Sequence, residues 1–140
     1  MTAKRNVYFF IMAGGAGTRF WPLSTKDCPK QFLPLFRGGK SLLELTIDRI
    51  SGKYDNKSIF ILTRESYRDH IINNYHIPKD NIIGEKYPRD TAASVAIAAY
   101  SSLAKDEESI CIILPSDHII DTAEDFCRDL DLILNYCNDH

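Results

Sequence analysis

The cysteines of this sequence lack the spacing of a metal site or a redox pair. The four of them are Cys28, Cys111, Cys127 and Cys137. No two form a C-x-x-C pair, and none is grouped with histidines at the spacing of zinc ligands. We therefore expect buried free thiols, which behave as small hydrophobic side chains, and a reducing, cytoplasmic location.

The chain also lacks an apolar run long enough to cross a membrane. Its N-terminal run, residues 7–13, is far shorter than the about 20 residues that a membrane-spanning helix needs. A glycine-rich stretch follows this run, where a signal peptide would have its cleavage site. We interpret the run as a buried strand and expect no membrane partner.

No strong excess of one charge is present, since 17 basic and 19 acidic residues give a formal net charge of -2. The field of such a molecule does not attract a polyanion, so we expect no nucleic acid partner. The length of 140 residues and the hydrophobic fraction of 44% fit one ordinary globular domain. Repeats and low-complexity segments are absent from the sequence.

Short apolar runs alternate with segments of helical periodicity. The expected strands are residues 7–12, 58–63, 81–84 and 109–114, and helices are expected from Ser41 onward and over residues 65–75, 91–103 and 123–136. Ser41 and Glu44 form a capping box. The helix at 91–103 is apolar nearly all round, which predicts burial. The last helix has an apolar stripe of Ala123, Phe126, Cys127, Leu130, Ile133, Leu134 and Cys137.

This alternation predicts a Rossmann-like α/β fold, an open and mostly parallel sheet with helices on both faces. Sheets of this kind bind ligands beyond the carboxyl ends of their strands. The glycine-rich loop begins at Ala13, directly after the first expected strand, and Asp117 lies just past the last one. Two distant segments therefore converge on one edge of the sheet.

The loop Ala13-Gly14-Gly15-Ala16-Gly17-Thr18-Arg19 is the strongest candidate for a phosphate-binding segment. Glycines let the backbone approach a polyphosphate and turn its N–H groups toward it. Arg19 adds a fork of donors, and Lys30 adds a compact charge. The dinucleotide fingerprint G-x-G-x-x-G fails because position 20 is Phe20. A glycine-rich turn with two surface cations is the alternative reading.

Three segments in order resemble the sugar nucleotidylyltransferases. The string GGAGTRFWPLS…PKQFL is similar to their glycine-loop signature, in the form of the mannose-1-phosphate guanylyltransferase branch. Residues 87–93, YPRDTAA, resemble the E-P-x-x-R-[ND]-T-A-P stretch, with a departure in spacing and with Ala93 in place of proline. Residues 114–118, LPSDH, match the L-P-[SA]-D-H segment.

The resemblance implies transfer of GMP from GTP to mannose 1-phosphate, giving GDP-mannose and pyrophosphate. In that reaction the loop amides of Gly15, Ala16 and Gly17 would hold the terminal phosphates, and Arg19 would clamp the leaving pyrophosphate. Lys30 would neutralise the α-phosphate, and Asp117 would bind Mg²⁺. For Asp117, the alternative is that its side chain only caps the following turn.

The resemblance also places Arg89, Asp90 and Thr91 near the base and ribose of the nucleotide. Asp90 or Thr91 can equally serve as the N-cap of the helix that follows. His118 is more simply a hydrogen-bonding neighbour of Asp117 than a catalytic base.

Members of this family are longer, so we expect the chain to be an N-terminal nucleotide-binding part without the sugar-phosphate-binding half. An uncovered apolar sheet face would then favour a homo-oligomer. Three other readings stay open: a non-catalytic nucleotide-binding module, a relative that uses another nucleotide or sugar phosphate, and a dinucleotide-dependent oxidoreductase.

Arg19→Ala tests the loop assignment. Loss of its charge-assisted hydrogen bonds should weaken triphosphate binding by about 2 kcal/mol, measured by calorimetric titration. An unchanged affinity would remove Arg19 from the site.

Overall fold

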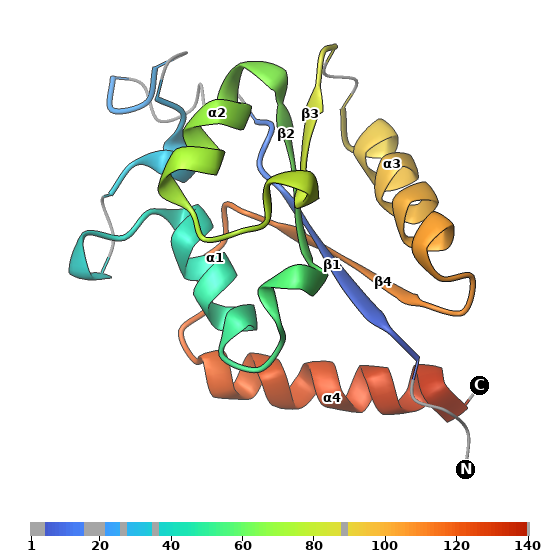
Figure 1. Cartoon of the computed structure of the whole chain (residues 1–140). Helices are drawn as coiled ribbons and strands as arrows, with labels where there is room; N and C mark the ends of the chain where they lie inside the picture. Colours follow the sequence, from blue (N-terminus) through green and yellow to red (C-terminus); the bar gives the residue numbers. More distant parts are fainter. Residues whose placement is uncertain (1–4, 16–21, 26–27, 35–36, 88–89, 140) are drawn as a thin grey trace.

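A computed structural model describes residues 5–15, 22–25, 28–34, 37–87 and 90–139 of the chain. Within these residues, four strands and four α-helices form an α/β fold, with short 3₁₀ turns between them (Figure 1). In chain order the elements are β1 (Val7–Met12), η2 (Lys30–Phe32), η3 (Arg37–Gly39), α1 (Leu42–Ser51), η4 (Asn56–Ser58), β2 (Ile59–Arg64), α2 (Glu65–Asn74), η5 (Lys79–Asn81), β3 (Ile82–Glu85), α3 (Asp90–Lys105), β4 (Ile110–Pro115) and α4 (Ala123–Asp139).

The sheet has the order β3-β2-β1-β4, and every neighbouring pair is parallel. In this register Phe9 lies beside Ile59 of β2 and Ile112 of β4. Because all strands run the same way, their carboxyl ends share one edge of the sheet. The Rossmann-like fold class expected from the sequence is confirmed by this topology.

Alternate residues of the central strands enter two separate cores. Phe9 and Ile61 belong to the larger core, which α1, α2 and α4 cover (Figure 1). Phe10 and Leu62 belong to the smaller core on the opposite face, where α3 contributes the buried Ala98. Helices therefore lie on both faces of the sheet, as the alternation of elements predicted.

Local signals define the start of the first helix. The Ser41 hydroxyl accepts a hydrogen bond from the Glu44 N–H at 3.2 Å, and the Glu44 carboxylate accepts one from the Ser41 N–H at 2.7 Å. The predicted capping box is thus present in full, and both bonds satisfy N–H groups that a helix start leaves without partners.

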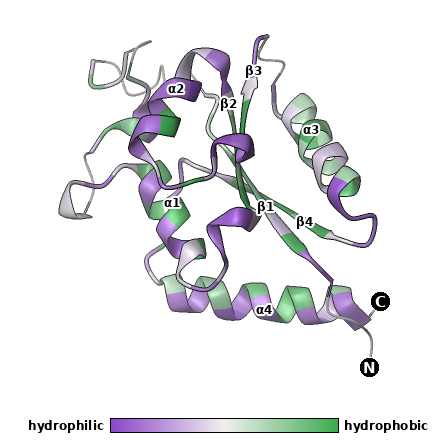
Figure 2. Cartoon of the chain, viewed as in Figure 1, coloured by the Kyte–Doolittle hydropathy of each residue, from purple (hydrophilic) through white to green (hydrophobic). Residues whose placement is uncertain are grey.

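The predicted burial of the helix at 91–103 is wrong. Figure 2 shows hydrophobic residues on α3 as well as on the strands, but only Ala98 and Ser102 of this helix are buried. Tyr100 is 74% exposed and Leu103 is 56% exposed. The helix packs on the sheet through one narrow face, and no other described element covers its outer side.

The apolar stripe predicted for α4 was also too wide. Leu130 and Leu134 are buried in the larger core, and the partly buried Phe126 packs against that core. Ala123 is exposed. Ile133 is 59% exposed, because it lies to the side of the helix stripe that contacts the larger core.

The cysteines are free, as expected, but their predicted burial is wrong. Cys28, Cys111, Cys127 and Cys137 are all half-buried. Cys111 shows the reason, since it lies on the edge strand β4, which is only partly covered. Burial still raises the pKa of the Cys111 thiol, which keeps it protonated at neutral pH.

A pair of isoleucines tests this account of the core. Ile61 is 0% exposed, so Ile61→Ala should lower the free energy of unfolding by about 2–5 kcal/mol through lost burial and a cavity. Ile133→Ala removes the same atoms from a mostly exposed site and should change it by less than about 0.5 kcal/mol. Urea unfolding of both variants measures the difference, and equal losses would contradict the packing.

Candidate nucleotide site

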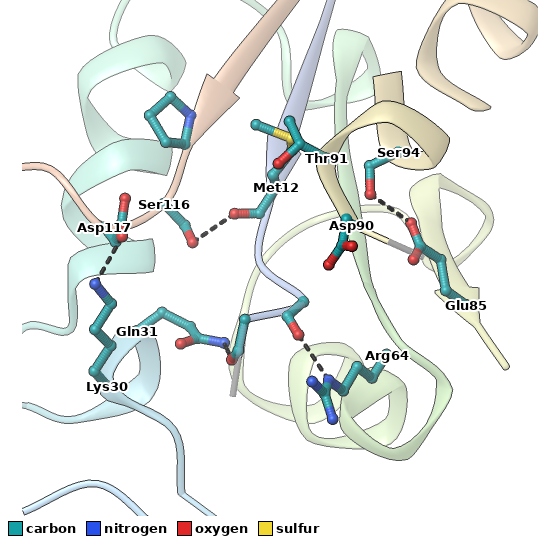
Figure 3. A pocket seen from close by; sticks show the side chains of 13 residues that line it. Met12, Lys30, Gln31, Arg64, Glu85, Asp90, Thr91, Ser94, Ser116 and Asp117 are labelled. Carbon is teal, nitrogen blue, oxygen red and sulfur yellow. Dashed lines mark hydrogen bonds and ion pairs between the residues drawn. The ribbon is translucent and has the colours of Figure 1, made fainter. Parts of the chain in front are cut away.

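A cavity of about 460 Å³ opens at the carboxyl edge of the sheet (Figure 3). All four strand ends contribute to its wall. The lining residues are Met12, Gly14, Gly15, Lys30, Gln31, Arg64, Glu85, Asp90, Thr91, Ser94, Pro115, Ser116 and Asp117. The two segments that the sequence placed at this edge, the glycine loop and Asp117, do meet there.

An ion pair joins two of the predicted site residues across 87 positions of sequence. Lys30 Nζ lies 2.7 Å from Asp117 Oδ2. Lys30 begins the turn η2, and Asp117 follows β4. Ser116 fixes the end of β4, because its N–H and its hydroxyl both donate to the Met12 carbonyl, at 3.2 Å and 2.7 Å.

The ion pair shifts the titration of its carboxylate. The pKa of Asp117 is lowered from its ordinary value, chiefly because Lys30 donates a hydrogen bond to it. Partial burial opposes this shift, and the charges of Lys30 and His118 add to it. Asp117 is therefore ionised at neutral pH and available as an oxygen ligand.

Side chains from neighbouring elements hold three consecutive carbonyls of the glycine loop. The Ala13 carbonyl accepts from Gln31 Nε2 at 3.0 Å and from Thr63 Oγ1 at 3.1 Å. The Gly14 carbonyl accepts from Arg64 Nε at 2.7 Å, and the Gly15 carbonyl accepts from Gln31 Nε2 at 3.0 Å. Satisfied in this way, these oxygens are less repulsive to an approaching anion.

The two glycines differ in their surroundings. A Cβ atom on Gly14 would touch the backbone of Thr63 and Arg64 at 3.8 Å, which is an ordinary contact. A Cβ atom on Gly15 would meet nothing within 4 Å. Packing within the described chain therefore does not demand glycine at position 15, whereas close approach of a ligand to the backbone would.

Predicted residues fall into three groups in the structure. Gly14, Gly15, Lys30, Asp90, Thr91 and Asp117 line the cavity, and Ala13 is buried behind it. Ala16, Gly17, Thr18, Arg19 and Arg89 lie outside the described residues. The five assignments on those positions stay predictions.

Asp90 and Thr91 begin α3 at the cavity wall. Asp90 has a φ of 61°, in the left-handed backbone region that residues other than glycine rarely adopt. Such outliers concentrate at functional sites, where the surrounding structure holds them. The His118 ring lies beside Asp117, with Nδ1 3.2 Å from Oδ1.

Several lining residues had no assigned role in the sequence, among them Gln31, Arg64, Glu85 and Ser94. Arg64 and Glu85 each end a strand, so the reasoning that selected Asp117 would have selected them as well. Gln31 was visible only as part of the string PKQFL. Nothing in its residue type indicates that it is 2% exposed and bonded to two loop carbonyls.

Comparison with known proteins identifies the family. The family model for nucleotidyl transferases matches residues 9–132. The chain belongs to the nucleotidyl transferase family. This match confirms the nucleotidyl transferase family, which the three sequence segments predicted.

Two sequence relatives of this chain are named as mannose-1-phosphate guanylyltransferases. Mannose-1-phosphate guanylyltransferase 2 of Escherichia coli O157:H7 is 37% identical over 122 residues, covering 84% of this chain and 25% of that protein. A mannose-1-phosphate guanylyltransferase of Salmonella montevideo is 39% identical over 121 residues, with the same coverage. The chain thus spans about a quarter of the length of these relatives.

A solved structure shares the fold of this chain. It is described as a mannose-1-phosphate geranyltransferase from Thermus thermophilus, and it superposes with a TM-score of 0.80 at 32% identity. The match covers 94% of this chain and 38% of the other. Within the described part of the present chain, no helix has the length and apolar character to cross a membrane.

The Lys30–Asp117 pair gives a prediction for pH dependence. Because the folded-state pKa of Asp117 is lowered, the pair stabilises the fold above the unfolded-state pKa of about 3.9 and this contribution is lost as the pH falls through the folded-state value. Its size is at most about 1 kcal/mol, since the Asp117 side chain is 38% exposed. Lys30→Met should raise the pKa of Asp117. Carbon NMR of the Asp117 carboxyl group during a pH titration measures this change.

Lys40 offers the matched control, because it pairs with Asp48 outside the cavity. The distance from Lys40 Nζ to Asp48 Oδ2 is 2.6 Å. Lys40→Met should leave the titration of Asp117 unchanged. If Asp117 titrates at the same pH in both variants, the ion pair at the cavity is not formed in solution.

Proposed function

We propose that this chain provides the GTP- and Mg²⁺-binding part of a mannose-1-phosphate guanylyltransferase, which transfers GMP from GTP to mannose 1-phosphate. The observation that carries the proposal is the ion pair of Lys30 and Asp117 beside the glycine loop, in one cavity at the carboxyl edge of the sheet. The sequence relatives, which are named for this activity, support it.

The reaction needs positioning and charge neutralisation more than a protein nucleophile. An oxygen of the sugar phosphate forms a bond to the α-phosphorus of GTP, and the bond from that phosphorus to the β-phosphate oxygen breaks, releasing pyrophosphate. Lys30 can neutralise the phosphates as charge moves to the leaving group, while the N–H groups at Gly14 and Gly15 bind oxygen atoms of the triphosphate.

Asp117 fits the metal that the proposal includes. Mg²⁺ in nucleotide sites takes one or two carboxylates and completes its shell with phosphate oxygens and water. The Asp117 carboxylate is ionised, partly exposed and at the cavity wall. Among the described residues, no group of three or more histidine, cysteine or acidic side chains could hold a metal by itself, so the phosphates would supply the other ligands. Bound there, Mg²⁺ would offset the charge of the triphosphate.

The proposal also includes a reducing, cytoplasmic location for this chain. The free, half-buried cysteines agree with that location.

Calorimetric titration with GTP, ATP and UTP, each with and without Mg²⁺, tests the proposal. We expect GTP to bind most tightly and its affinity to depend on Mg²⁺. Asp117→Asn should remove most of the Mg²⁺ dependence and lower the free energy of unfolding by no more than the about 1 kcal/mol that its ion pair with Lys30 contributes.

Asp121→Asn is the matched control, since it changes the same residue type at an exposed position that does not line the cavity. Equal affinity for the three triphosphates, or the same Mg²⁺ dependence in both variants, would contradict the proposed function.

A further inference from the structure

Gln31 is a buried polar side chain in the cavity wall, and both of its donors are in use. The residue is only 2% exposed. Its Nε2 atom donates to the Ala13 carbonyl and to the Gly15 carbonyl, each at 3.0 Å. Figure 3 shows the amide directed at the backbone beyond the end of β1. Because a primary amide has two N–H groups, none is left to bind a ligand.

The Gly15 carbonyl depends on this amide more than its neighbours do. The Ala13 carbonyl has a second donor in Thr63, and the Gly14 carbonyl accepts from Arg64. Among the described residues, Gln31 is the only donor to the Gly15 carbonyl. Packing does not hold Gly15 either, since a Cβ atom there would meet nothing within 4 Å. The orientation of this carbonyl therefore rests on Gln31.

The turn η2, which carries Gln31, is anchored in the larger core. The Phe32 N–H donates to the Pro29 carbonyl at 3.0 Å and closes the turn. The Phe32 side chain is 7% exposed, and its ring centroid lies 5.6 Å from that of Tyr67 and 6.3 Å from that of Tyr75. Gln31 thus connects the glycine loop to a fixed part of the protein.

The same turn also places the cation of the site. Lys30 directly precedes Gln31 and forms the ion pair with Asp117. A trans peptide directs its N–H away from its C=O, so the bond to the Ala13 carbonyl also fixes the Gly14 N–H. One short turn therefore sets both the position of the ammonium group and the orientation of the loop beside it. Groups oriented in advance bind a ligand without the cost of ordering them.

We infer that Gln31 is a positioning residue for triphosphate binding, which acts by holding the glycine loop in its binding shape beside Lys30. This inference rests on the proposed function and adds the side chain that organises its phosphate site. Gln31 makes no contact with the phosphates itself, because both N–H groups of its amide are occupied by loop carbonyls.

Gln31→Met tests this role, since methionine has a similar length and shape but no N–H donor. We expect the Kd for GTP with Mg²⁺ to rise by about tenfold or more. The Kd for inorganic tripolyphosphate should rise by a similar factor, because the loss concerns the phosphates and not the base. Calorimetric titration measures both values, well below the unfolding temperature of the variant.

Asn81 provides a matched control away from the cavity. It is 7% exposed, and its Nδ2 atom donates to the carbonyls of Lys57 and Ile59, each at 2.9 Å. Asn81→Leu therefore removes an equivalent pair of buried hydrogen bonds. Both variants should unfold at a lower temperature than the unaltered chain, but Asn81→Leu should change either Kd by less than about twofold. Equal changes of Kd in the two variants would mean that Gln31 only supports the fold.

NMR of the side-chain amide groups gives a second test, which needs no variant and decides the matter if Gln31→Met does not fold. In the unaltered chain, the Gln31 amide signals should shift when tripolyphosphate is added, because the loop carbonyls that they bind lie beside the ligand. The Asn81 amide signals should stay in place.

The outcomes separate this inference from the proposed function. If the unaltered chain binds GTP in preference to ATP and UTP, but Gln31→Met binds it equally well or the Gln31 amide signals do not move, the inference is wrong and the proposed function stands. If the unaltered chain binds no triphosphate, the proposed function fails and the inference fails with it.

Discussion

The parallel alignment of four strands is the constraint on which the rest of the structure depends. It brings the ends of β1, β2, β3 and β4 to one edge, so that residues from positions 12 to 117 line a single cavity. Each strand end adds a different chemical group to this cavity. β1 leads into the glycine loop, β2 ends in Arg64, β3 ends in Glu85, and β4 leads to Asp117. An antiparallel pairing would send half of these groups to the opposite edge.

Features of the fold that depend on neighbours in sequence were predictable. The first strand occupies residues 7–12 as expected, and the capping box at Ser41 is complete. Burial was predicted less well, because an apolar sequence does not reveal how many layers will cover it. The outer face of α3 and the side chain of Ile133 are exposed since each helix contacts the sheet through a stripe narrower than its hydrophobic pattern.

In the candidate site, too, residues in local sequence motifs were predicted, and residues that strand register brings together were missed. Sequence motifs selected Lys30 and Asp117, and the structure brings these two side chains together. Arg64 and Glu85 were missed because their importance depends on register: they are neighbours across two strands, and each is drawn away by a different partner. A single sequence does not encode that arrangement in any short pattern, although their places at strand ends were a usable signal.

The central claim is that the cavity at the carboxyl edge of the sheet holds the nucleotide. Backbone amide NMR shifts of the chain during addition of GTP and Mg²⁺ test it most directly. The account predicts the largest changes at Gly14, Gly15, Thr91 and Asp117, which line that cavity from three separate segments. Changes concentrated instead at the smaller hollow beside Ile83, Ala93 and Ile97, with the cavity residues unmoved, would contradict it.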